Sequence, residues 1–463
     1  MKKSILIFLI ITITSCLYGQ NIIDTWNTKL NVNGQSLAIV IHIKDTIASH
    51  VTLDSPDQYA YGLKCDTVSF IDDKIYIGLS QAKIEIKGQF DKEKDVITGK
   101  FSQMAFSCDV EFVRGDYIKE KNVRPQDPTD FPYYQEDIFV TDSTTSVTLA
   151  ATLTMPDDVQ AESVVILISG SGAQNRNEEV LDHRPFLVLS DFLTRNGIAV
   201  IRYDDRGTAE STGNFAGSTT YDFADDVESI VNYIHTRNEL KNMKIGLAGH
   251  SEGGMIAPIV ASRRNDIDFL VLLAAPAVPI TKLYHKQLHD LMAVANTPEE
   301  ILSIEDKFNK KAFDILTNDK LSKEEKYDKC VKLRKKSYLK YPEGWIGNMD
   351  VDLRSSEEIS MYMSPWMYEF INFEPAVYLS QINIPVLALN GTNDLQVNCD
   401  QNFDEMNKIL QKAGNTNYKI MKLEGLNHIF QKCIFGAPAL YAKNKETFNE
   451  DAMKIIAEWI HKM

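Results

Sequence analysis

The hydrophobic pattern of the chain changes twice, and each change marks a different kind of structure. Over residues 21–118, β-branched and polar residues roughly alternate in short runs, such as Ser36 to Lys44 and Lys74 to Leu79, and turn pairs such as Asn33-Gly34 separate them. Alternation places successive side chains on opposite faces of a strand, and no helical period occurs here. We therefore predict a small antiparallel β domain, a barrel or a sandwich.

Residues 119–134 carry three prolines among charged residues, which predicts a linker. Beyond it, short continuous apolar runs, such as Ser163 to Ile168 and Phe269 to Leu273, alternate with amphipathic stretches, such as Pro185 to Arg195. Continuous apolar runs favour parallel strands buried on both faces, and the stretches between them have the helical period. Residues 135–463 therefore read as an α/β domain.

The alternation stops between residues 280 and 378, where capped helix starts occur at Thr297 to Glu300 and at Ser322 to Glu325. The second of these helices is rich in lysine, which favours a solvated face. We predict a helical insertion. Because it falls between two strands of the sheet, where active-site loops open, we expect it to form a cap.

The first twenty residues have the three-part pattern of an export signal: Lys2-Lys3, an apolar run from Ser4 to Thr14, and small or polar residues after it. The run is too short to span a membrane, and no later segment is predicted to do so. Ile13 to Cys16 resembles a lipobox, in which Cys16 would carry a lipid anchor, whereas Leu17 to Gln20 resembles a plain cleavage site. We favour plain cleavage and expect an exported protein, periplasmic or secreted, with a lipoprotein as the alternative.

Composition narrows the classes further. The chain of 463 residues has 64 acidic and 49 basic side chains, a net charge of −15, which disfavours a nucleic-acid partner. No cysteine or histidine cluster has metal-binding spacing, so a structural zinc is not expected. The motifs of the chain imply no metal or organic cofactor. Cys65 and Cys108 could pair in an oxidising compartment, and the sequence leaves this pairing and the oligomeric state open.

The strongest chemical signal is Gly249-His250-Ser251-Glu252-Gly253, between a short apolar strand and a helix. In that context G-x-S-x-G forms a tight turn that presents the serine hydroxyl above the sheet, and the glycines leave room for it. A serine needs a base, and in this architecture the acid and the histidine follow it in the chain. Asp394 and His428 each lie just beyond a predicted strand, so we assign Ser251 as nucleophile, His428 as base and Asp394 as its partner, over the competing Asp400 and Asp404.

The loop Ser169-Gly170-Ser171-Gly172 follows the strand that ends at Ile168. Its glycines let the backbone approach a carbonyl oxygen, so the N–H groups of Ser171 and Glu252 are the expected oxyanion donors.

On these segments the sequence resembles the exported α/β-hydrolase esterases of the EstD type and, more broadly, serine aminopeptidase-like hydrolases. The resemblance is carried by Gly170 to Asn177, His183 to Leu189, Arg202 to Thr208, the serine turn, Asn390 to Val397 and Asn427-His428. It implies an α/β-hydrolase fold, and it implies carboxylesterase activity of the same triad. Ser364-Pro365-Trp366 also matches, which makes Trp366 the expected pocket wall.

Three residues depart from the family pattern: Asn175 and Asn177 stand where acidic residues are usual, and Ala209 where glycine is usual. They lie outside the triad and affect loop detail and substrate fit. Asp205 and Arg206 are expected to form a structural ion pair beneath the site.

The sequence therefore predicts an α/β-hydrolase fold with a helical cap over about 280–378, preceded by a small all-β domain. The predicted activity is hydrolysis of short-chain carboxylic esters through an acyl-enzyme on Ser251, with a small-molecule ester as the partner. An aminopeptidase or amide hydrolase on the same triad is one alternative, and a non-catalytic surface-binding protein is another. The sequence does not identify the acyl and alcohol groups of the substrate.

Overall fold

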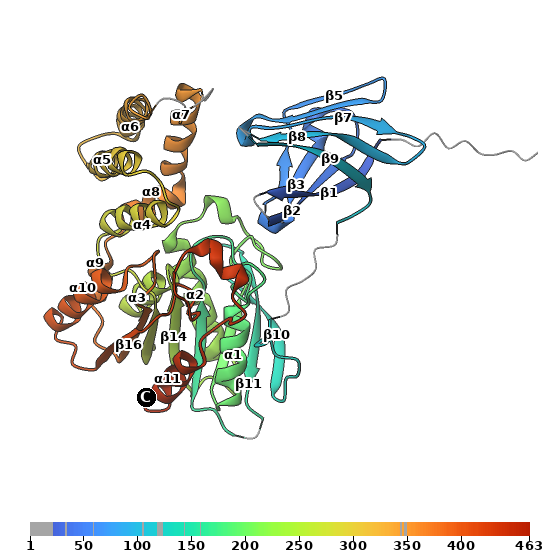
Figure 1. Cartoon of the computed structure of the whole chain (residues 1–463). Helices are drawn as coiled ribbons and strands as arrows, with labels where there is room; N and C mark the ends of the chain where they lie inside the picture. The colour runs from blue at the N-terminus through green and yellow to red at the C-terminus, as the bar shows by residue number, and fades with distance from the viewer. Residues whose placement is uncertain are drawn as a thin grey trace, which may run out of the picture. The chain divides into compact units, whose positions relative to one another are not determined.

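The computed structural model describes residues 22–32, 35–58, 60–103, 106–117, 124–142, 144–157, 159–342, 345–346 and 350–463 (Figure 1). The chain divides into two compact units, Met1–Asn122 and Val123–Met463. The predicted export signal with Cys16, the Asn33-Gly34 turn and residues 119–123 of the predicted linker lie outside the described residues.

The first unit is one curved antiparallel sheet around its own core. Its strands are β1 (Asp24–Val32), β2 (Gln35–Ile43), β3 (Val51–Ser55), β4 (Ala60–Lys64), β5 (Thr67–Ile71), β6 (Lys74–Leu79), β7 (Ile84–Asp91), β8 (Val96–Gln103) and β9 (Phe106–Arg114). They pair in the order β4-β3-β2-β1-β9-β8-β7-β6-β5. Trp26, Phe101 and Phe112 are fully buried on the inner face. The prediction of a small antiparallel β domain is confirmed, and its form is a half-barrel.

The two cysteines of this unit are free thiols, so the disulfide considered from the sequence does not form in this structure. Cys65 follows β4 and is buried in the core, and burial raises the pKa of its thiol to about 11. Cys108 lies on β9 opposite Phe101 of β8 and is half-buried.

The second unit contains an eight-stranded sheet. Its strands are β10 (Tyr134–Thr141), β11 (Thr148–Met155), β12 (Ser163–Ile168), β13 (Ala199–Tyr203), β14 (Lys244–His250), β15 (Phe269–Leu273), β16 (Val386–Gly391) and β17 (Tyr418–Leu423). Their order is β10-β11-β13-β12-β14-β15-β16-β17. The pairs β10/β11 and β11/β13 are antiparallel and all the others are parallel. The site-bearing strands β12, β14 and β16 therefore end at one edge of the sheet, as the α/β-hydrolase fold requires.

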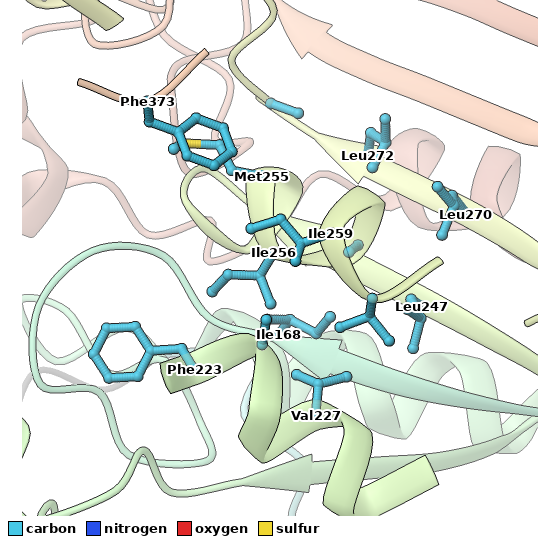
Figure 2. Packing of buried hydrophobic residues seen from close by; sticks show 14 of the residues in the cluster. Ile168, Phe223, Val227, Leu247, Met255, Ile256, Ile259, Leu270, Leu272 and Phe373 are labelled. Carbon is cyan, nitrogen blue, oxygen red and sulfur yellow. The ribbon is translucent and has the colours of Figure 1, made fainter. Parts of the chain in front are cut away.

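Helices cover both faces of this sheet. They are α1 (Pro185–Arg195), α2 (Thr220–Thr236), α3 (Gly253–Arg263), α10 (Cys399–Lys412) and α11 (Glu450–Ile460). Residues of α1 and α11 share a core with one face, and those of α2, α3 and α10 with the other. Figure 2 shows the core that α2 and α3 share with the sheet, in which Ile256 and Ile259 of α3 lie between side chains of the sheet and of α2. Close packing on both sides gives the strand–helix turn before α3 a rigid base.

Between β15 and β16 the chain forms the predicted helical insertion. Its described helices are α4 (Ile280–Val294), α5 (Glu299–Leu316), α6 (Lys323–Tyr338), α7 (Val351–Tyr362), α8 (Pro365–Ile371) and α9 (Pro375–Leu379). Ser322 and Glu325 form the predicted capping box of α6. At α5 the prediction was wrong in detail, because Pro298 occupies the N-cap position without a side-chain cap.

The lysine-rich helix α6 is not solvated on every side. Arg334 is buried and donates to Glu305 of α5 at 2.6 Å and to Glu358 of α7 at 2.8 Å. Lys326 is also buried and donates to the hydroxyl of Tyr368. These two cations tie α6 to its neighbours because each has a partner that compensates for lost hydration. No helix within the described ranges is long and apolar enough to cross a membrane.

Residues 124–134, part of the predicted linker, belong to the second unit and hydrogen-bond to distant segments of it. Arg124 donates to the backbone carbonyls of Leu181 and Ala442, and Gln126 accepts from the N–H of Phe448 at 3.1 Å. The partners Ala442 and Phe448 lie more than 300 positions along the chain from Arg124 and Gln126, so no local pattern indicates these contacts.

Candidate active site

Ser251 lies in the tight turn between β14 and α3. Its φ is +53°, the left-handed region that costs an L-residue about 1 to 3 kcal/mol unless the surroundings impose it. Its N–H donates to the carbonyl of Leu273 at the end of β15, which fixes the turn to the neighbouring strand. The strained turn presents the side chain at the edge of the sheet where the parallel strands end.

The glycines of this turn are sterically required. A Cβ at Gly249 would lie 2.0 Å from the carbonyl oxygen of Gly253, and a Cβ at Gly253 would lie 2.1 Å from that of Ile168. Both are backbone contacts far shorter than real Cβ atoms make, so no rotation of a side chain could relieve them. The turn therefore accepts only glycine at both positions.

Asp394 and His428 come together from the loops after β16 and β17. The Oδ2 atom of Asp394 lies 2.8 Å from Nδ1 of His428. Its Oδ1 atom accepts the N–H groups of Gln396 and Val397 at 2.8 and 2.9 Å. The carboxylate is fully buried, so it stays fixed and holds the imidazole with Nδ1 protonated. The competing Asp400 and Asp404 are exposed on α10, away from His428.

With Nδ1 donating to Asp394, the Nε2 atom of His428 is the position that can accept a proton. Ser251 and His428 line one cavity of about 390 Å³. In the described part of the chain the Ser251 hydroxyl has no hydrogen-bond partner, so the contact with His428 is not formed in this state. Catalytic hydrogen bonds of free enzymes are often long and tighten when substrate binds.

The loop after β12 borders the same cavity and supplies Gly170 and Ser171. The N–H of Gly170 donates to Oε1 of Glu178 at 2.8 Å and so cannot serve a substrate. For the N–H groups of Ser171 and Glu252, the described residues offer no acceptor. Both residues line the cavity beside Ser251, as an oxyanion hole requires.

The cap closes the cavity with apolar and aromatic side chains. Trp366 stacks on Phe370, with ring centroids 5.0 Å apart, and both line the cavity with Leu283 and Tyr284 of α4. Of the neighbouring methionines in the sequence, Met361 is exposed and Met367 is packed in the core. An apolar group of modest size fits such walls.

Trp366 also connects the cap to the serine turn. Its Nε1 donates to Oε1 of Glu252 at 2.9 Å, and the hydroxyl of Thr220 donates to the same oxygen at 2.6 Å. Burial raises the pKa of the Glu252 carboxyl, and hydrogen bonds from Thr220, Trp366 and Ser171 oppose that rise. The side chain of Glu252 thus anchors α8 while its backbone faces the cavity.

The expected ion pair between Asp205 and Arg206 is wrong. Arg206 pairs with Asp226 of α2, at 2.7 and 2.8 Å. Asp205 instead accepts from the hydroxyl of Ser169 and the N–H of Gln174, both at 2.9 Å, and so holds the loop that carries Ser171. Burial raises the pKa of Asp205 to about 8.

The departure at Asn177 has a structural consequence. Its side-chain oxygen accepts from the guanidinium of Arg202, which is buried and has no carboxylate partner within the described ranges. Burial lowers the pKa of Arg202 to about 10. An amide compensates a buried cation less well than a carboxylate does.

Two residues of this site were missed by sequence reasoning. Glu178 and His250 are buried beside the triad and hydrogen-bonded to each other at 2.7 Å. His250 was noticed only as a neighbour of the nucleophile. The sequence gives one weak signal for Glu178, which is a carboxylate close to the glycine-rich loop. A carboxylate in a loop is usually exposed to solvent, and only the fold shows that this one is buried.

The chain is similar in sequence to known hydrolases. The family model described as serine aminopeptidase, S33, matches residues 184–334. Esterase EstD of Thermotoga maritima is 23% identical over 283 residues, which cover 61% of this chain. The chain spans 58% of the length of that relative.

Similar solved structures include an esterase of Pyrococcus furiosus, with 16% identity and a TM-score of 0.45, covering 76% of this chain and 95% of that one. A proline iminopeptidase of Mycobacterium smegmatis has 16% identity and a TM-score of 0.43, covering 71% of this chain and 98% of that one. The chain is therefore similar in sequence to the serine aminopeptidases of family S33 and to esterase EstD, and its sheet has the strand order of an α/β-hydrolase fold.

Proposed function

We propose that this protein is a serine carboxylesterase. The observation that carries the proposal is that strained Ser251 and the buried Asp394–His428 pair face one cavity, with the free N–H groups of Ser171 and Glu252 beside them. A hydrolase that forms an acyl-enzyme needs these parts and no metal or organic cofactor.

In the proposed reaction, His428 Nε2 takes the Ser251 proton as Oγ attacks the ester carbonyl carbon. The tetrahedral oxyanion accepts hydrogen bonds from the N–H groups of Ser171 and Glu252. His428 returns the proton to the leaving alcohol, and Asp394 stabilises the imidazolium while it exists. In the second half of the reaction, His428 takes a proton from a water molecule as that water attacks the acyl carbonyl carbon. His428 then gives the proton to Ser251 Oγ as the acyl–oxygen bond breaks, which releases the carboxylic acid and restores Ser251.

The cavity supports small esters as substrates. Its volume of about 390 Å³ lies at the low end of small-molecule sites, and Trp366 and Phe370 offer an apolar surface to an acyl chain. We therefore propose short-chain carboxylic esters.

An amide hydrolase with aminopeptidase activity is the second candidate, because the matching family model is that of serine aminopeptidases. The same triad would serve either bond.

A panel of chromogenic esters of increasing acyl length and of aminoacyl amides, assayed with the wild type and Ser251→Ala, tests both candidates. We expect kcat/KM to be highest for short acyl esters and the alanine variant to lose at least a thousandfold. Faster cleavage of aminoacyl amides would favour the peptidase, and full activity of Ser251→Ala would refute both.

A further inference from the structure

A buried acid–histidine pair outside the triad connects three segments of the site. Oε1 of Glu178 accepts the N–H of Gly170 at 2.8 Å and lies 2.7 Å from Nδ1 of His250. On the other side of the ring, Nε2 of His250 lies 2.9 Å from the carbonyl oxygen of His428. Glu178 and His250 are 5% and 6% exposed, so these contacts with protein atoms are made by largely buried groups.

These contacts fix the protonation of His250. Each ring nitrogen faces an oxygen: Nε2 faces a backbone carbonyl, which cannot donate, and Nδ1 faces Glu178, which cannot donate when it is ionised. Both nitrogens must therefore carry hydrogen, so the ring is an imidazolium and Glu178 is its carboxylate partner.

The charged groups around the ring agree with this state. Burial alone would lower the pKa of His250, but the charge and hydrogen bond of Glu178, the His428 carbonyl and the charge of Asp394 outweigh it and raise that pKa. The ring of His428 lies 4.7 Å away between centroids, and Phe430 closes another side at 6.2 Å.

Each contact of the Glu178–His250 pair lies next to one of the proposed catalytic groups. Gly170 immediately precedes the oxyanion donor Ser171, and His250 immediately precedes the nucleophile Ser251. The third contact is the backbone of the base itself. A Cβ at Gly170 would lie 3.1 Å from Cβ of Ser251 and 3.5 Å from Nδ1 of His250, so the loop packs closely against the serine turn at this glycine.

We propose that Glu178 and His250 are positioning residues, and that their buried carboxylate–imidazolium pair sets the oxyanion loop, Ser251 and His428 in register. This inference rests on the proposed hydrolase function, to which it adds two residues that border the cavity and act by holding the catalytic groups in place. Loss of either member leaves the other charge buried and unpaired, which shifts the three segments it joins.

The protonation state can be measured without activity. In a two-bond ¹H–¹⁵N spectrum of protein labelled at histidine, we expect His250 to give an imidazolium pattern that persists at pH 8, where an ordinary imidazole is neutral. His250→Gln identifies the signal. A neutral His250 at pH 7 would overturn the pair.

The positioning role is tested by a kinetic cycle of Glu178→Gln, His250→Gln and the double variant, with Glu179→Gln as the matched control beside it. We expect each single variant to lower kcat about 10- to 100-fold with little change in KM, because misplaced groups slow chemistry more than binding. The double variant should lose less than the product of the single losses, since no charge is left unpaired.

The outcomes separate the inference from the function beneath it. If the wild type is an active esterase and the Glu178→Gln and His250→Gln variants keep its full activity, the positioning role alone is overturned. A folded wild type that cleaves neither esters nor amides would overturn the proposed function, and the catalytic meaning of the pair with it. Purely additive losses, with changes in KM rather than kcat, would assign the pair to general stability.

Discussion

At the residue scale, Ser251 has a conformation that only its surroundings maintain. Its φ of +53° is held by the Leu273 carbonyl and by two glycines that admit no side chain. The motif alone could identify this residue, because G-x-S-x-G between strand and helix specifies both the strain and its location. The Glu178–His250 contact could not be predicted, since it joins residues 72 positions apart through a loop without a regular period.

Asp394→Asn tests the assignment of the acid. An amide in place of the carboxylate cannot stabilise an imidazolium and can favour the wrong tautomer, so we expect kcat to fall about 10³- to 10⁴-fold. Asp400→Asn is the matched control, because Asp400 is exposed and pairs with Lys422. Steady-state kinetics of both variants decide the matter, and the reverse order of effects would make the assignment wrong.

Trp366→Ala tests the pocket wall. Removing the indole lengthens the apolar space beside Phe370, so we expect the kcat/KM ratio of octanoyl to acetyl p-nitrophenyl esters to rise about tenfold. Trp366→Phe keeps an aromatic wall but loses the N–H to Glu252, and should keep a ratio near that of the wild type. An unchanged ratio in folded Trp366→Ala protein would return this residue to a packing role.

At the scale of elements, the sequence predicts the ends of a helix best where neighbouring residues alone determine them. Helix α1 begins and ends at Pro185 and Arg195 as predicted, because proline at the first helical position and the apolar period both mark it. The curvature of the β sheet and the docking of residues 124–134 were not predictable. They depend on contacts such as that of Arg124 with Ala442, which form only after distant segments fold.

His183, two residues before helix α1, makes the free energy of unfolding depend on pH. It is fully buried, donates Nε2–H to the Tyr441 carbonyl and accepts at Nδ1 from Thr447, so it is neutral. Burial lowers its pKa to about 4. As pH falls from about 6.5 to 4, the unfolded chain takes up a proton here and the folded chain does not, so stability falls.

We therefore expect the unfolding free energy of the wild type to drop by about 2 kcal/mol more than that of His183→Gln between pH 7 and pH 4. Urea unfolding at several pH values measures this difference. His235→Gln, at an exposed histidine paired with Asp266, is the control. Parallel curves for the wild type and His183→Gln would contradict a buried neutral His183.

At the scale of the whole molecule, two units with separate cores share one chain, and the proposed chemistry lies in the second. That much of the organisation followed from the change of hydrophobic period near residue 120. The identity of the substrate could not be predicted from the sequence. The cavity walls come from α4 and α8 of the cap and from loops, and the positions of these segments depend on the complete fold.

We also propose that residues 1–20 direct export. Expressed in a Gram-negative host, the protein should appear in the periplasm or medium with a mature N-terminus near Gly19 or Gln20, measured by mass spectrometry. Cys16→Ser should leave this processing unchanged if cleavage is plain, and should abolish a lipid adduct if Cys16 is the anchor. Intact Met1 on cytoplasmic protein would contradict both forms of export.

The central claim is that Ser251 is the nucleophile of an acyl-enzyme. A fluorophosphonate should add once per chain, abolish esterase activity in step with the adduct, and map to the peptide that contains Ser251, because phosphonates mimic the tetrahedral intermediate. Folded Ser251→Ala protein should remain unlabelled. Labelling at another residue, or full esterase activity in the alanine variant, would contradict the account.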